Sequence, residues 1–143
     1  MKTIFDWKIY ALGSALFAGV TAVLAKVGVK NIPSNLATLI RTCVILLFLG
    51  LLVVSRKEWI NPFKLNRWSL LFLVLSAVTT GISWLCYYRA LQTGPASMVA
   101  PIDKLSLVVA IVLSLVFLRE SFNAYQMVGA SFVIVGVLLM VLK

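Results

Sequence analysis

Five long apolar runs fill almost the whole sequence and decide what the chain can fold into. Prolines, glycines and an asparagine typical of helix ends separate them, and the runs cover approximately residues 9–29, 35–54, 68–92, 96–118 and 124–142. A helix of about 20 apolar residues crosses the roughly 30 Å hydrocarbon core of a bilayer. The sequence therefore predicts an all-α polytopic membrane protein, with five transmembrane helices in a single domain over residues 1–143.

The composition agrees with this interpretation, because 62% of the residues are apolar and 12% are charged. A soluble domain is about half apolar and a quarter charged. The first run lacks a small-residue cleavage site, so we expect a retained helix and not a cleaved signal peptide. Cys43 and Cys86 fall inside apolar runs without CxxC spacing, and we expect buried thiols with packing roles.

The net charge of +9 would suggest a nucleic-acid partner for a soluble protein. Here the cations flank apolar runs, so we expect contacts with lipid headgroups and no nucleic acid. With a cytoplasmic N-terminus, seven cations lie inside and three outside, namely Lys2, Lys8, Arg56, Lys57, Lys64, Arg67 and Arg119 against Lys30, Arg89 and Lys143. The positive-inside rule then favours a cell-membrane protein with its C-terminus outside. Counting the three cations within spans as outer reduces the bias to seven against six.

Ionisable residues inside the predicted spans are candidates for a functional site, because they are costly in lipid. Five of them fall in the outer half of the membrane, namely Lys26, Arg41, Arg89, Asp103 and Lys104. Arg41 and Asp103 each lie about 10 Å below the outer end of their helix, at 1.5 Å per residue. Lys26 and Arg89 lie nearer the ends, so their heads either snorkel to the interface or join the cluster.

Asp103 is too short to reach water from that depth and needs a partner or a wet cavity. It either lines a functional cavity or forms a structural ion pair with Arg41 or Arg89. Lys104 is about 100° around the helix from Asp103, so we expect one of the two to face the cavity and the other to point away. Four cations against one acid favour an anionic or zwitterionic ligand.

The third run carries a polar stripe, because Ser76, Thr80, Ser83 and Tyr87 share one helical face. Such a stripe either joins helices through hydrogen bonds or lines a solvated path. Thr80, Tyr87 and the nearby Trp84 are candidate ligand contacts, since aromatic side chains can stack on an amphipathic solute.

Two further features concern the fourth and fifth helices. Pro101 removes one backbone donor beside Asp103, so the helix there either exposes backbone polar groups or is only kinked. Gly129 and Gly136 are seven residues apart on nearly one face, which suits close packing of helices.

The stretch WLCYYRALQTGPASMVAPIDKLSLVVAIVLSLVFLRES, residues 84–121, resembles the EamA domain of the drug/metabolite transporter superfamily. The similar features are the aromatic YYRALQ, the GPAS turn, VAP followed by IDKLS, and a helix ending in FL before Glu120. The family often has a neutral residue after the proline of this helix, where this chain has Asp103 and Lys104.

The resemblance implies one five-helix half of a ten-helix transporter whose two halves have opposite orientations. A dimer would supply the second half, either as an antiparallel homodimer or with an oppositely oriented partner half; a parallel dimer is the third possibility. The last helix is also similar to the dimerisation helix of small multidrug-resistance proteins. By that similarity Gly129 and Gly136 belong to a subunit interface.

We therefore expect a secondary transporter of a small metabolite that works by alternating access. The alternatives are a flippase subunit for a lipid-linked sugar or headgroup, and an accessory membrane subunit without transport of its own. The chain has no histidine, no cysteine cluster and no paired carboxylates, so we expect neither an enzyme nor a metal or cofactor site.

Overall fold

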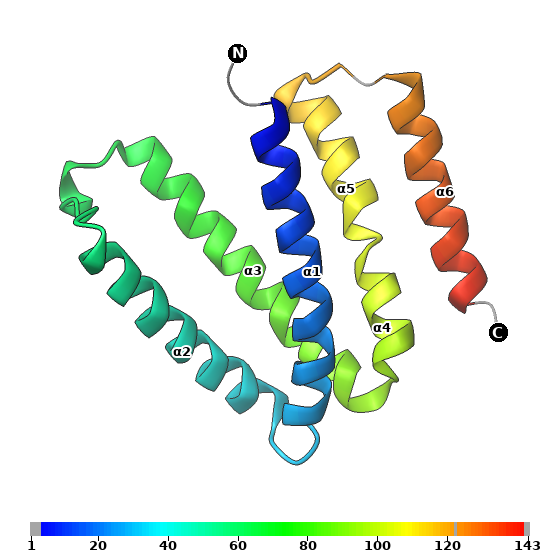
Figure 1. Cartoon of the computed structure of the whole chain (residues 1–143), viewed down its shortest axis with the longest axis horizontal. Coiled ribbons are helices and arrows are strands. Elements are labelled where there is room, and N and C mark those ends of the chain that lie inside the picture. The colour runs from blue at the N-terminus through cyan, green and yellow to red at the C-terminus, as the bar shows by residue number, and fades with distance from the viewer. Residues whose placement is uncertain (1–3, 122, 142–143) are drawn as a thin grey trace. The chain divides into compact units, whose positions relative to one another are not determined.

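A computed structural model of the chain describes residues 4–121 and 123–141 (Figure 1), so Lys2, Leu142 and Lys143 lie outside the described residues. Every regular element in this part of the chain is a helix. They are α1 (Ile4–Gly28), α2 (Ser34–Ser55), the 3₁₀ turn η1 (Pro62–Lys64), α3 (Arg67–Thr93), α4 (Ala96–Asp103), α5 (Ser106–Leu113), the π-helical η2 (Ser114–Leu118) and α6 (Ala124–Val141).

The predicted fold class is confirmed, because five helical stretches of the described chain are long and apolar enough to cross a membrane. Four boundaries of the second and third helices are within one residue of the prediction. The first helix begins at Ile4, five residues earlier than predicted. Most apolar side chains on these helices are exposed, as expected for surfaces that meet lipid or another subunit.

The fourth predicted helix is interrupted between α4 and α5. Pro101 lies inside α4 and has no N–H for the preceding turn. The chain then tightens, because Lys104 N donates to Pro101 O and Leu105 N to Ile102 O, each at 3.0 Å. These i→i+3 bonds satisfy the carbonyls at the break, so the backbone turns there without leaving those two groups unbonded.

Two helix ends depend on residues with a left-handed backbone. At the end of α2, Lys57 has a φ of 57°. Its N–H donates to Val54 O, and the Glu58 N–H donates to Val53 O, which is the Schellman pattern. At the end of η2, Arg119 has a φ of 53°. Both helices therefore stop through backbone geometry at positions where glycine is commoner.

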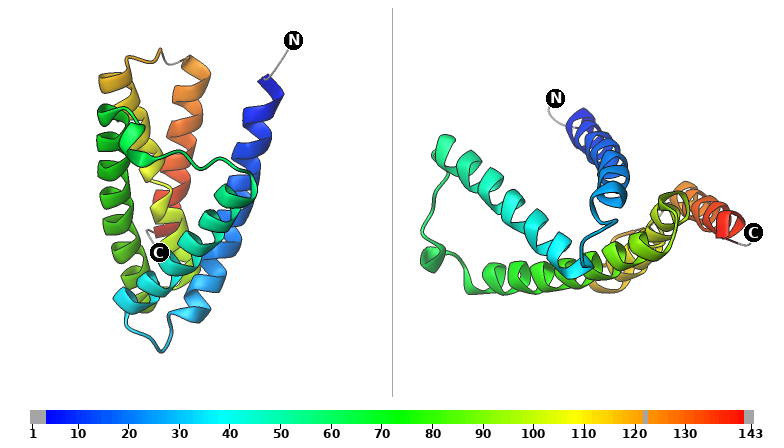
Figure 2. Two further views of the ribbon diagram at one scale, coloured as in Figure 1. Left: turned by 90° about the vertical axis from the view of Figure 1, so that its left-hand side faces the viewer. Right: turned by 90° about the horizontal axis from the view of Figure 1, so that it is seen from below.

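Residues 25–93 form one compact unit, and the residues before and after them form another. In the first unit α2 and α3 run antiparallel, lie closest where α2 begins, and diverge toward the loop that contains η1 (Figures 1 and 2). In the second unit α6 packs against α4 and α5 and runs in the opposite direction (Figure 1). The prediction of a single domain stays a prediction.

The core of the 25–93 unit is small and lies at one end of the hairpin. Val29, Leu91, Tyr88 and Thr38 are its buried side chains, together with Ala25. They come from the last turn of α1, the following linker, the start of α2 and the end of α3. Of the charged candidates from the sequence, Lys26 and Arg41 bond to residues of this core.

Cys43 and Cys86 are free and exposed. The prediction that they are buried is wrong for this chain, because the hairpin has one small core and both thiols lie outside it.

Candidate functional site

Arg41 lies against two aromatic rings of α3. Its guanidinium carbon is 4.3 Å from the centroid of the Trp84 ring and 5.7 Å from that of Tyr88. Its Nη1 also donates a hydrogen bond to Tyr88 Oη at 3.2 Å. The side chain is half-buried, so the rings replace part of the water that the charge has lost.

The antiparallel hairpin explains this pairing. Arg41 is seven residues into α2, and Trp84 and Tyr88 are nine and five residues before the end of α3. The two depths match, and the i,i+4 spacing puts both rings on one face of α3. Tyr87 meets the edge of Tyr88, with ring centroids 6.5 Å apart and planes at 68°.

A second set of contacts joins the end of α3 to the linker between α1 and α2. Lys26 Nζ donates to the backbone carbonyl of Leu91. The Gln92 amide nitrogen donates to Ile32 O at 2.7 Å and to Val29 O at 3.3 Å. The Lys26 head is therefore held by protein, and its place in the predicted cluster stays a prediction.

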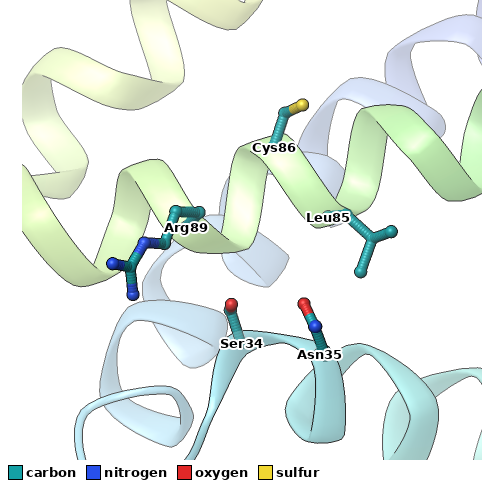
Figure 3. A pocket seen from close by; sticks show the side chains of 5 residues that line it. All are labelled: Ser34, Asn35, Leu85, Cys86 and Arg89. Carbon is teal, nitrogen blue, oxygen red and sulfur yellow. The ribbon is translucent and has the colours of Figure 1, made fainter.

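Arg89 lies on an exposed face of α3 and donates from Nη1 to Gln92 Oε1 at 3.2 Å. It also lines an open hollow of about 650 Å³ between the start of α2 and α3. In Figure 3 Ser34 and Asn35 point from α2 toward α3, Leu85 points from α3 toward α2, and the Arg89 guanidinium lies to one side of Ser34. Cys86 lines the hollow as well, although its sulfur points away from α2 in this view.

The charge of this unit is strongly unbalanced. Residues 25–93 contain eight Lys and Arg and a single acid, Glu58, which lies in the loop beyond the end of α2. Aromatic rings, an amide and a backbone carbonyl serve as partners of Arg41, Arg89 and Lys26 in this unit. None of these partners is charged, so they do not neutralise the Arg41 and Arg89 guanidinium groups.

Asp103 and Lys104 belong to the other unit. Lys104 Nζ is 3.6 Å from Asp103 Oδ2; the Lys104 side chain is exposed and that of Asp103 is half-buried. The helix ends at Asp103, and Lys104 stands in the turn that follows, so an angular separation of about 100° does not keep the two charges apart. The pairing of Asp103 with Arg41 or Arg89 stays a prediction.

The Thr80 hydroxyl of the polar stripe, and that of its neighbour Thr79, bond to their own helix. Thr80 Oγ1 donates to Ser76 O at 2.8 Å, and Thr79 Oγ1 donates to the same carbonyl at 2.9 Å. Thr80 lies one turn before Trp84 on an exposed part of α3. Such internal bonds satisfy a hydroxyl in lipid and do not decide between helix contact and a solvated path.

Gly129 and Gly136 are exposed on α6, and a Cβ built at either position meets no atom within 4 Å. Both positions are open to an approaching surface, and their place in a subunit interface stays a prediction. Among the residues that the structure describes, no three His, Cys, Asp or Glu side chains gather closely enough to hold a metal ion.

Sequence reasoning missed the contribution of Tyr88, Gln92, Ser34 and Asn35. Tyr88 is the ring that hydrogen-bonds Arg41, whereas the prediction named its neighbour Tyr87, and named it as a candidate ligand contact. Matching the depths of polar residues along the two antiparallel helices would have found Tyr88. The role of Gln92 depends on the path of the linker backbone, for which the sequence carries no signal.

Comparison with known proteins then gives three results. The model of the EamA-like transporter family matches residues 6–142. The "Uncharacterized transporter in cobO 3′region" of a Sinorhizobium species is 46% identical over 135 residues, which cover 94% of this chain and 96% of that relative. An uncharacterized protein of Methanocaldococcus jannaschii is 30% identical over 126 residues, covering 88% of this chain and 89% of that relative. No solved structure matches the chain.

Proposed function

Because the chain belongs to the EamA-like transporter family, we propose that this membrane transporter is a secondary transporter of a small anionic or zwitterionic metabolite. It works by alternating access across the cell membrane and makes no chemical change to the solute. Arg41, Arg89 and Asp103 contact the solute or the coupling ion. Lys26, Thr80, Trp84, Tyr87 and Lys104 complete the proposed binding region.

The observation that carries the proposal is the environment of Arg41. Within residues 25–93 its guanidinium makes one hydrogen bond, so four of its five N–H groups are open to other partners. The Trp84 and Tyr88 rings fix its plane, and a fixed guanidinium can bind a carboxylate through two parallel bonds. A cation held by uncharged partners at this depth attracts an anionic group more strongly than it would in water.

We also propose that two halves assemble into the working transporter. Both relatives are matched over most of their own length, so each of them is a chain of about this size. A homodimer, antiparallel in the simplest case, or an oppositely oriented partner half would complete the site. Gly129 and Gly136 lie at the proposed interface, where small residues let helices approach closely.

The proposed orientation has a cytoplasmic N-terminus and an external C-terminus. It rests on the cation count of the sequence, with the basic loop between α2 and α3 inside. The hollow and Arg41 would then lie in the outer half of the membrane, and the solute would meet them from outside.

Transport by reconstituted protein tests the proposal. Proteoliposomes are offered radiolabelled succinate, glutamate, alanine, leucine, lysine and spermidine, and uptake is compared with protein-free vesicles. We expect uptake of an anionic or zwitterionic member of this panel. Arg41→Lys keeps the charge but loses the planar fork, and we expect uptake to fall about tenfold or more, the equivalent of about 1.4 kcal/mol. We expect Asp103→Asn to abolish uptake.

Arg56→Gln is the matched control, because it removes a cation at the opposite end of α2 from the hollow. We expect it to transport like the unaltered protein. Uptake of lysine or spermidine alone would contradict the proposed charge class. Unchanged uptake in both Arg41→Lys and Asp103→Asn would reject the proposed site.

A further inference from the structure

The hollow beside Arg89 has the chemistry of an anion site. Its polar lining consists of the Ser34 hydroxyl, the Asn35 amide and the Arg89 guanidinium, and Leu85 and Cys86 complete it. None of these side chains is acidic, and the three polar groups all carry hydrogen-bond donors. Carboxylate and phosphate oxygens are the acceptors that such a set matches best.

Arg89 is held in place by a neighbour that is itself fixed. Its Nη1 bonds Gln92 Oε1, while the nitrogen of the same amide donates to Ile32 O and Val29 O. The linker carbonyls thus set the orientation of the Gln92 side chain, and its oxygen points to Arg89. Within residues 25–93 this is the one hydrogen bond of the guanidinium, which leaves four N–H groups for a ligand.

No acid of this unit lies near enough to neutralise the hollow. The single one, Glu58, follows the far end of α2, and that helix of 22 residues is about 33 Å long. Screening at physiological salt reduces interactions strongly beyond about 8 Å. Within residues 25–93, the positive charge of Arg89 is therefore not neutralised at the mouth of the hollow.

The hollow is separate from the Arg41 contact although both use α3. Leu85 and Arg89 are four residues apart on one stripe of the helix, whereas Trp84 and Tyr88 form the adjacent stripe about 100° around it. Arg41 lies seven residues deeper along α2 than Ser34, or about 10 Å. Along α2 a ligand beside Ser34 is thus nearer the helix end than one bound at Arg41, whereas along α3 the two sets of residues differ in face and lie at similar depths.

We propose that this hollow is a second binding site, in which Arg89 binds a carboxylate or phosphate group. The ligand either binds here before it reaches Arg41 or binds here without reaching Arg41 at all. If the ligand is the transported solute, this proposal rests on the proposed function, and the solute would meet Arg89 before Arg41. An anionic lipid headgroup offers the same chemistry, and the experiment below separates the two sources.

A thiol placed in the hollow can measure its electrostatic potential. Ser34→Cys is made in a Cys43→Ala/Cys86→Ala background, which removes the two natural cysteines of the chain. In phosphatidylcholine vesicles at low salt, the thiol reacts with an anionic methanethiosulfonate, the ethylsulfonate, and separately with a cationic one, the ethyltrimethylammonium. Arg89 also raises the thiolate fraction, but this speeds both reactions and cancels in their ratio.

We expect the labelling rate of the anionic reagent, divided by that of the cationic one, to be higher at this cysteine than for a small thiol in solution. One charge about 7 Å away in water changes each rate about threefold in opposite directions, so the ratio shifts about sevenfold. Arg89→Gln should remove this preference, whereas Arg56→Gln, the matched loss of a cation at the far end of α2, should keep it. Asn35→Cys is the second reporter and should show the same preference.

Two further arms identify the source of the anion. Inorganic phosphate added to the phosphatidylcholine vesicles should slow labelling if the hollow takes a soluble anion. Vesicles with phosphatidylglycerol should slow it, relative to the Arg89→Gln variant in the same vesicles, if the hollow takes a lipid headgroup. Either result supports the site.

A rate ratio at both reporters equal to that of the small thiol in solution would overturn the proposal, and so would a preference that survives Arg89→Gln. Labelling that neither phosphate nor phosphatidylglycerol slows would also overturn it. These readouts need no transport. A preserved preference without uptake would reject the proposed function alone, and uptake without the preference would reject this second site alone.

Discussion

Arg41 is a charge inside a predicted membrane span, and its partners are two rings and a hydroxyl in place of a carboxylate. A carboxylate would neutralise it and leave little attraction for an anionic solute. A ring holds the guanidinium through its quadrupole and does not cancel its charge. At the scale of the residue, this difference separates a binding group from a structural ion pair.

The Trp84 ring should therefore contribute measurably to stability. Trp84→Leu removes the ring that lies 4.3 Å from Arg41, and we expect the free energy of unfolding to fall by about 1–2 kcal/mol. Unfolding by sodium dodecyl sulfate in mixed micelles measures it. Trp59→Leu is the control, since Trp59 is 70% exposed in the loop after α2. An equal loss in both variants would show that the stacking contributes nothing.

The same residues show how far the sequence could predict the site. Arg41 and Trp84 could be identified singly, because a charge or a large amphipathic ring is unusual within an apolar run. Their contact could not, because it depends on the register of α2 against α3. The hollow depends on how far the two helices diverge, which small differences in packing decide.

At the scale of the helix, the sequence predicted the ends of the second and third helices well, but it did not decide whether the fourth span is interrupted. Hydropathy averages over a long window, and this average stays high across the junction of α4 and α5 although Asp103 and Lys104 stand there. The interruption comes from single backbone groups, namely the missing N–H of Pro101 and the i→i+3 bonds that follow it. Pro101 predicted either a break or a kink. Which of the two occurs could be seen only from the backbone hydrogen bonds of the structure.

Pro101→Ala should restore regular helix across this junction. The substitution returns an N–H to the preceding turn and removes a ring that costs a helix interior about 3 kcal/mol. We expect the amides of Lys104, Leu105 and Leu107 to exchange hydrogen at least about tenfold more slowly. Hydrogen–deuterium exchange with mass spectrometry measures this in micelles. Pro95→Ala, just before α4, should leave those amides unchanged; equal slowing by both would place the cause elsewhere.

For the whole molecule, the main feature is how little of the apolar surface the chain covers by itself. Large side chains on all five predicted spans are exposed, and the buried set is small. Lipid can cover such surfaces, and so can a second half. The sequence could predict that the helices are mostly apolar, but not which apolar face meets lipid and which meets protein, because lipid and protein both accept the same side chains.

Substitution at the α6 glycines distinguishes these possibilities. Gly136→Leu meets no atom of the chain at its Cβ, so the isolated fold should accept it. A close helix partner should not, and we expect the dimer fraction in micelles to fall about tenfold or more. Crosslinking and light scattering after size-exclusion chromatography measure it. Gly50→Leu on α2, equally open, is the control. A dimer that tolerates Gly129→Leu and Gly136→Leu would place the interface on another face.

The division into two units also bears on the order in which the chain is made. Residues 25–93 are continuous, so every contact of the hairpin and its linker can form once residue 93 has left the ribosome. The other unit joins the beginning of the chain to its end. Its first helix must wait for about 50 further residues, or roughly 3–10 s of synthesis at typical rates. During that interval the insertion machinery contains the complete, positively charged hairpin of residues 25–93, while the other unit is still incomplete.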